Sequence, residues 1–243
     1  MFQRRVIPVL LLKNNGLVKG FKFKNHKYIG DAMNSIRIFN NKRVDELFLV
    51  DITATKRNCS IDARFVAKVA DECYMPFAVG GGIRTIDQMK CLIRAGAEKV
   101  NINTEAVSRP QLIREAAETF GSQCIVVSID YRKDLFGRKR VFTNCGSNKT
   151  NKDPLSWAQE VESLGAGEIL LTCINREGTQ EGYDLETLSK ITASLSIPVI
   201  ASGGAGTAQH FQEAFAKDAY AVSAGTMFVF KGKHRSVLIQ YYK

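Results

Sequence analysis

Short apolar runs alternate with amphipathic segments along the 243-residue chain. The runs are almost continuously apolar, which is typical of strands that are covered on both faces of a parallel sheet. Between them, apolar residues recur at helical spacing, as at Phe65, Val66 and Val69. The pattern predicts strands at 6–12, 47–52, 77–79, 100–103, 125–129, 168–174, 199–201 and 220–224. It predicts helices at 31–41, 61–73, 86–95, 110–120, 154–164, 185–195, 208–216 and 236–242.

Eight strand–helix units follow one another without a linker rich in proline or serine. A chain of this length commonly forms one α/β barrel. We therefore expect an α/β protein with a (βα)8 TIM barrel fold, formed as a single domain by residues 1–243. An open doubly wound sheet is the alternative, but it normally has fewer strands.

A repeat of half the chain favours the barrel. Pro76 and Gly82 recur as Pro198 and Gly204, an offset of 198 − 76 = 122 in one case and 204 − 82 = 122 in the other. This period is far longer than the roughly 20–50 residues of a solenoid unit. It indicates a barrel built from two similar (βα)4 halves.

Glycine-rich turns and hydroxyl side chains follow the expected strands of both halves. Gly82, Asn103 and Thr104 come from the first half. Gly204, Gly225 and Thr226 come from the second. The C-terminal ends of barrel strands meet at the end that carries active sites, and backbone N–H groups in glycine-rich turns can bind anions. Tight turns and helix caps would explain one such group, but the repetition favours two phosphate sites.

Composition narrows the possible partners. The formal net charge of +10 suits an anionic ligand. Basic residues are scattered without aromatic interleaving, so nucleic acid is not expected. The six cysteines form no C-x-x-C pair and no histidine lies at zinc-ligand spacing, so we expect no metal, and a reducing cytoplasm fits. No apolar run approaches the length of a membrane helix.

The glycine-rich loops and the strands around them resemble a known family. The match is densest at 79–84, 97–107, 120–130, 165–172, 178–184 and 197–206, and it extends along nearly the whole chain. These segments resemble the cyclase subunit of imidazole glycerol phosphate synthase, a barrel of histidine biosynthesis. The resemblance implies a lyase/cyclase without a cofactor, in a heterodimer with a glutaminase. Ammonia from that partner would pass through the barrel to a substrate with a phosphate at each end.

The resemblance assigns residues to three kinds of site. It places one phosphate at Gly82, Asn103 and Thr104 and the other at Gly204, Gly225 and Thr226. It makes Asp130 one of two catalytic aspartates. It assigns a ring of charges that gates ammonia at the bottom of the barrel to Arg5, Glu46, Lys99 and Glu168. Solvated surface charges are the alternative interpretation of these four.

The chain departs from the family pattern at strand one. Leu11 stands where the second catalytic aspartate is expected, and no carboxylate lies between 6 and 13. Asn175 and Glu177 replace two further aspartates. A diverged branch associated with surface-polysaccharide gene clusters is more similar at strand one. Two hypotheses follow: a diverged cyclase subunit, or an ammonia conduit that serves a third protein, an amidotransferase making an amidino sugar.

Overall fold

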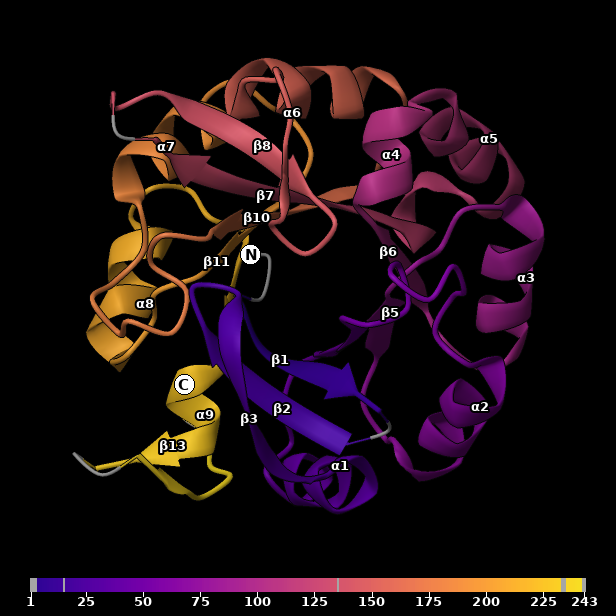
Figure 1. Cartoon of the computed structure of the whole chain (residues 1–243), viewed down its shortest axis with the longest axis vertical. Coiled ribbons are helices and arrows are strands. Elements are labelled where there is room, and N and C mark those ends of the chain that lie inside the picture. Colours follow the sequence, from indigo (N-terminus) through magenta and orange to yellow (C-terminus); the bar gives the residue numbers. More distant parts are fainter. Residues whose placement is uncertain (1–3, 15, 135, 233–234, 242–243) are drawn as a thin grey trace.

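Eight parallel strands close into a barrel in the computed structural model, which describes residues 4–14, 16–134, 136–232 and 235–241. The strands are β1 (Arg5–Lys13), β4 (Leu47–Asp51), β5 (Phe77–Gly80), β6 (Lys99–Ile102), β7 (Ile125–Lys133), β10 (Glu168–Cys173), β11 (Val199–Ser202) and β12 (Ala221–Ala224). Pairing of β10 with β7 and of β12 with β1 closes the ring. Figure 1 shows helices around these strands. The (βα)8 prediction is therefore confirmed.

The helices form the outer layer of the barrel (Figure 1). They are α1 (Ala32–Asn41), α2 (Ala63–Glu72), α3 (Ile86–Arg94), α4 (Thr104–Ser108), α5 (Gln111–Phe120), α6 (Pro154–Ser163), α7 (Leu185–Thr192), α8 (Ala208–Phe215) and α9 (Thr226–Val229), with a 3-10 turn at Ser122–Cys124. Aspartates cap several of them: Asp31, Asp62, Asp153 and Asp184 each accept a bond from a first-turn N–H. Such caps fix where each helix begins.

The half-chain repeat is visible in the elements themselves. Adding 122 to the bounds of β5 gives those of β11, and the same shift carries β6 onto β12 and α1 onto α6. The short helices α4 and α9 also begin 122 residues apart. Gly81 and Gly203 share a positive φ, and a side chain at either would collide with the carbonyl oxygen that ends the neighbouring strand.

Two hairpins over one end of the barrel were not expected from the sequence. One consists of β2 (Gly16–Phe21) and β3 (Lys24–Asp31), and the other pairs β7 with β8 (Lys139–Thr143), which continues to β9 (Asn148–Lys149). Both lie in front of the barrel strands in Figure 1. The sequence of the first hairpin lacks a clear alternation because β3 is largely exposed and polar.

The predicted helix at 236–242 is wrong for the residues that the structure describes. Phe230–Lys231 (β13) pairs with Ser236–Val237 (β14), and the amides of Leu238 and Gln240 donate to Val229 and Phe228. Extended pairing satisfies the backbone here, whereas a helix of one or two turns would be marginal. Tyr242 lies outside the described residues.

The barrel interior contains a separate apolar cluster. It consists of Ile7, Phe48, Ala78, Val126, Leu170, Ile200 and Ala221, with Val9 packed against them. The larger cluster fills the space between the strands and the helices. Within the described residues, no helix has the length and apolar character needed to cross a membrane.

Candidate functional site

The mouth of the barrel contains a cavity bounded by the C-terminal ends of the strands and by both hairpins. Gly82, Asn103, Thr104, Asp130 and Gly225 all line it. The structure thus brings residues of the first predicted phosphate site, the predicted aspartate and part of the second site to one place. Gly204 and Thr226 are buried and do not line it.

The first predicted anion site has glycine at its turn for a steric reason. Gly82 has φ +64°, and a Cβ there would collide with the carbonyl oxygen of Cys59. The Thr104 hydroxyl at the start of α4 already has partners. It accepts from the amide of Asn144 at 3.0 Å and lies 3.4 Å from Asn103 Oδ1.

The second predicted anion site differs from the first. The Thr226 side chain is only 3% exposed, and its hydroxyl has no hydrogen-bond partner among the described residues. A buried hydroxyl without a partner is costly, so an incoming acceptor atom would satisfy it. Gly204 has φ +120°. The ammonium group of Lys19 lies where a side chain on Gly225 would be.

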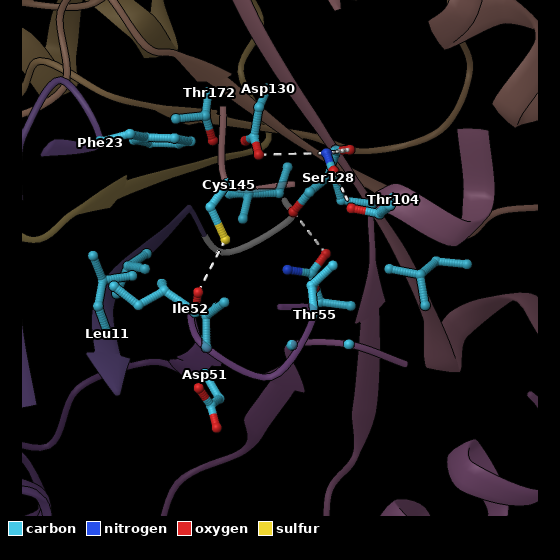
Figure 2. Close-up of a pocket in the computed structure, with 18 of the residues that line it drawn as sticks. Leu11, Phe23, Asp51, Ile52, Thr55, Thr104, Ser128, Asp130, Cys145 and Thr172 are labelled. Carbon is cyan, nitrogen blue, oxygen red and sulfur yellow. Dashed lines mark hydrogen bonds between the residues drawn. The ribbon is translucent and has the colours of Figure 1, made fainter. Parts of the chain in front are cut away.

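Asp130 follows a continuous run of buried residues in β7 and projects into the cavity (Figure 2). Asn103 Nδ2 lies 3.3 Å from its Oδ2, and the Thr172 hydroxyl on neighbouring β10 binds the same carboxyl. The pKa of Asp130 is raised to about 7, chiefly by burial; the Thr172 bond opposes this shift and the negative charge of Glu177 adds to it. Near neutral pH this carboxyl can therefore both hold and release a proton.

The wall of the cavity formed by β1 and β4 is apolar. Leu11 lies there with Val9, Val50 and Ile52. Figure 2 shows Leu11 and Ile52 on the far side of the cavity from Asp130. Asp51 ends β4, and its carboxylate is fully engaged: Oδ1 accepts from Thr53 N, Thr53 Oγ1 and Ala54 N, and Oδ2 accepts from Arg57 at 2.8 Å. No carboxylate therefore faces Asp130 from β1 or β4.

Lys19 and Glu177 were not among the predicted site residues, yet both line the cavity. Lys19 lies on β2, is 4% exposed, and forms an ion pair with Glu177 from the loop after β10. A buried lysine is rare unless it is paired. Lys19 lies in a hairpin that the sequence pattern did not predict. Glu177 was noticed only as a departure from the family.

The opposite end of the barrel carries the predicted ring of charges. Arg5 pairs with Glu46 and with Glu168. Lys99 Nζ lies 2.9 Å from Glu46 and 3.0 Å from Glu168. Each cation thus bridges the two glutamates, and the four side chains form a closed ring at the N-terminal ends of β1, β6 and β10 and the residue before β4.

The alternative that these four are solvated surface charges is wrong. Glu46 is 2% exposed and Glu168 is 4% exposed. Burial raises the pKa of Glu46, whereas Arg5 and Lys99 lower it. The two glutamates together raise the pKa of Arg5 against the effect of its burial. The ring is therefore a coupled, largely desolvated network rather than a set of rim charges.

The apolar cluster of the barrel interior separates this ring from the mouth. Ile7 and Phe48 follow the ring residues Arg5 and Glu46 by two positions, so they lie one layer further into the barrel. Val9, Val50 and Leu170 then line the floor of the mouth cavity. A small neutral molecule can cross such a layer far more easily than an ion.

A metal is not implied by these side chains: no group of three or more His, Cys, Asp or Glu in the described part of the chain could hold one. The arrangement defines a (βα)8 barrel with a buried, titratable carboxyl at the mouth and a buried charge ring at the opposite end.

Comparison with known proteins places this barrel in a family. The family model described as "Histidine biosynthesis protein" matches residues 5–235. The chain is 48% identical over 242 residues to the putative imidazole glycerol phosphate synthase subunit hisF2 of Pseudomonas aeruginosa, covering 99% of this chain and 96% of that protein. It is 47% identical over 234 residues to the imidazole glycerol phosphate synthase subunit HisF of Hydrogenobaculum sp., covering 95% of this chain and 92% of that protein. The chain belongs to the histidine biosynthesis protein family.

Proposed function

We propose that this chain is a HisF-type cyclase subunit of imidazole glycerol phosphate synthase, in a heterodimer with a glutaminase. It receives ammonia at the ring of Arg5, Glu46, Lys99 and Glu168 and passes it through the barrel to a phosphorylated acceptor at the mouth. The closed charge ring is the observation that carries this proposal. Names of related proteins support it, since the relative from Hydrogenobaculum is called a HisF subunit of this synthase.

The physical basis is the order in which the charge ring, the apolar layer and the mouth follow one another along the barrel axis. A buried ring of two cations and two anions closes one end to solvent. The apolar layer beyond it opposes ammonium because it cannot replace the hydration of an ion. Neutral ammonia would reach Asp130, which can take up a proton near neutral pH.

A second candidate function is supported by Leu11. Its position leaves the strand-one side of the mouth without an acid/base group. The chain would then conduct ammonia to a third protein, an amidotransferase that makes an amidino sugar for surface polysaccharide. The numbered names of relatives such as hisF2 and hisF3 support a paralogue beside a conventional subunit. In either function we propose a cytoplasmic, single-domain protein with a phosphorylated small-molecule ligand.

The test is transfer of isotope from glutamine. The chain is co-expressed with the glutaminase encoded nearest to it, and the complex is given [amide-15N]glutamine in excess unlabelled ammonium salt. We expect the complex to co-purify, glutamine hydrolysis to increase, and product to carry 15N because bulk ammonium does not mix with the channelled ammonia. Failure to associate and failure to stimulate hydrolysis would together contradict the proposal. Identification of the labelled product then separates the two candidate functions.

A further inference from the structure

Four carboxylates line the mouth cavity: Asp51, Glu105, Asp130 and Glu177. Asp51 is saturated by its own loop and by Arg57. Glu105 lies in the first turn of α4 and also lines the groove outside the rim, with Lys56 and Ser147. Glu177 is thus the remaining carboxylate that can act together with Asp130.

Glu177 is fixed in place by its backbone and by the hairpin above it. Its amide donates to the carbonyl oxygen of Cys173, the last residue of β10, at 3.1 Å. Its carbonyl oxygen accepts from the amide of Lys22 at 2.9 Å, which fastens the β2–β3 hairpin to this loop. Asp130 lies on the adjacent strand, where its register partner is Thr172 of β10. Asp130 therefore lies on the strand beside the one that leads into the Glu177 loop (Figure 2 shows Asp130 and Thr172 side by side).

Lys19 links Glu177 to the second anion site. Its ammonium group pairs with Glu177 and lies against Gly225, the residue before Thr226, whose buried hydroxyl has no partner among the described residues. The Lys19 side chain is 3% exposed and the Glu177 side chain is 13% exposed, so little water screens the pair. An anion at Gly225 and Thr226 would thus compete with Glu177 for the same ammonium group.

We propose that Glu177 is a positioning residue that couples anion binding to proton binding at the mouth. Without an anion, Lys19 offsets the charge of Glu177. When a divalent anion takes the site at Gly225 and Thr226, Lys19 turns to it, and Glu177 is left beside Asp130 with its charge no longer offset. Asp130 then holds a proton more firmly, because a like charge disfavours its ionised form. Asp130 would therefore be prepared to act as an acid only when the phosphorylated ligand is bound.

This inference rests on the proposed function for its ligand but can be tested on the chain alone. Sulfate is the probe, since it remains divalent near neutral pH and any proton taken up must bind to the protein. Isothermal titration in two buffers of different protonation enthalpy gives the number of protons taken up per sulfate. The other charged or titratable side chains on the cavity wall are Lys19, His26, Asp51, Arg84, Glu105 and Cys145.

We expect the wild-type chain to bind sulfate at pH 7.5 with uptake of a measurable fraction of a proton. Glu177→Gln should reduce that uptake at least threefold and tighten sulfate binding roughly 3–10-fold, because Lys19 loses its competitor. Lys19→Met should weaken binding by about tenfold or more. Glu181→Gln removes the same charge from an exposed position on the same loop and should change neither quantity.

Three results would overturn the inference. One is the absence of sulfate binding at this site, and another is binding without proton uptake in the wild type. The third is uptake that survives in Glu177→Gln, which would point instead to His26, whose pKa is lowered by burial and by Lys13, Lys19 and Lys56. Each result is independent of whether a glutaminase binds at the other end, so the outcome does not depend on the test of the proposed function.

Discussion

Glu46 and Glu168 occupy equivalent places in the two halves of the barrel, and each binds both cations of the charge ring. Their separation of 168 − 46 = 122 residues is the period of the half-chain repeat. Arg5 and Lys99 do not share this relation, because 127 and 221 are Val127 and Ala221. The ring is thus a duplicated pair of anions closed by two cations from the first half only.

Lys99→Met should lower stability in a way that depends on pH. It removes one cation from two buried glutamates, so we expect a loss of about 2–4 kcal/mol at pH 8. Burial already raises the pKa of Glu46, and loss of Lys99 raises it further. The folded state then binds the proton more strongly than the unfolded state, so the deficit grows as pH rises and shrinks toward pH 5.

Chemical denaturation between pH 5 and pH 8 measures this deficit. Lys90→Met, at an exposed position on α3, is the matched control and should behave like the wild type throughout. A Lys99→Met deficit that is flat across this range would show that the ring is not the coupled network inferred here. The expectation of a solvated surface charge would have predicted almost no effect at any pH.

Asp130→Asn should remove the ionisation of Asp130, which makes the folded protein less stable as pH rises. The pKa of Asp130 is about 7 in the fold against 3.8 for the ordinary group, so the folded state keeps a proton that the unfolded chain has already lost. The stability that this bound proton contributes is present at low pH and is lost as pH rises toward and through 7. Relative to Asp130→Asn, the wild type should lose roughly 2–4 kcal/mol between pH 4 and 8.

The measurement is the difference in unfolding free energy between the two proteins across that pH range. Asp71→Asn changes an exposed carboxyl on α2 and serves as the control. A wild type that gains stability relative to Asp130→Asn as pH rises would show that Asp130 is instead held as a stabilised anion.

The sequence was sufficient to predict the barrel, since its eight buried strands have a strong apolar signal and the repeat fixes how the halves correspond. The charge ring joins residues that are far apart in the sequence, and it could be predicted only through the family resemblance. No residue near Lys99 in the sequence indicates that Glu168 is its partner. The β2–β3 hairpin was missed because β3 is largely polar and exposed, with Lys24, Asn25 and Lys27 facing solvent. The pairing of Lys19 with Glu177 depends on that hairpin and could not be predicted without it.

The two threonines of the predicted anion sites should respond differently to removal of the hydroxyl. Thr226→Val removes a buried group without a partner, so we expect unchanged or slightly increased stability together with at least a tenfold loss of phosphate affinity. Thr104→Val removes the acceptor for the Asn144 amide, so it should cost about 1–2 kcal/mol.

Thermal unfolding with and without inorganic phosphate compares the pair, and crystals grown in phosphate or sulfate should show the anion at one or both sites. Equal stability losses would contradict the difference between the two sites.

The chain should be a poor cyclase on the twin-phosphate substrate of the family, because Leu11 provides no proton transfer from strand one. One positioned acid/base group is typically worth about 10²–10⁴ in rate. Asp51 cannot substitute for it, since its carboxylate is already hydrogen-bonded to Thr53, Ala54 and Arg57. Glu177 lies after β10, beside Asp130 rather than across the mouth from it, and therefore suits a ligand held in another pose.

Leu11→Asp tests whether the barrel has kept the structure of the family while the reaction that it supports has changed. With saturating ammonium salt and no glutaminase, wild-type turnover should be slower than Leu11→Asp turnover by about tenfold or more. Leu11→Asn is the matched control: it has nearly the same size and polarity as aspartate but cannot exchange a proton, so it should stay as slow as the wild type. Substrate binding should be similar in all three, which places the difference in the rate of the chemical step. Wild-type turnover at a rate ordinary for enzymes would refute the prediction, and it would make Asp130 and Glu177 sufficient for the family reaction.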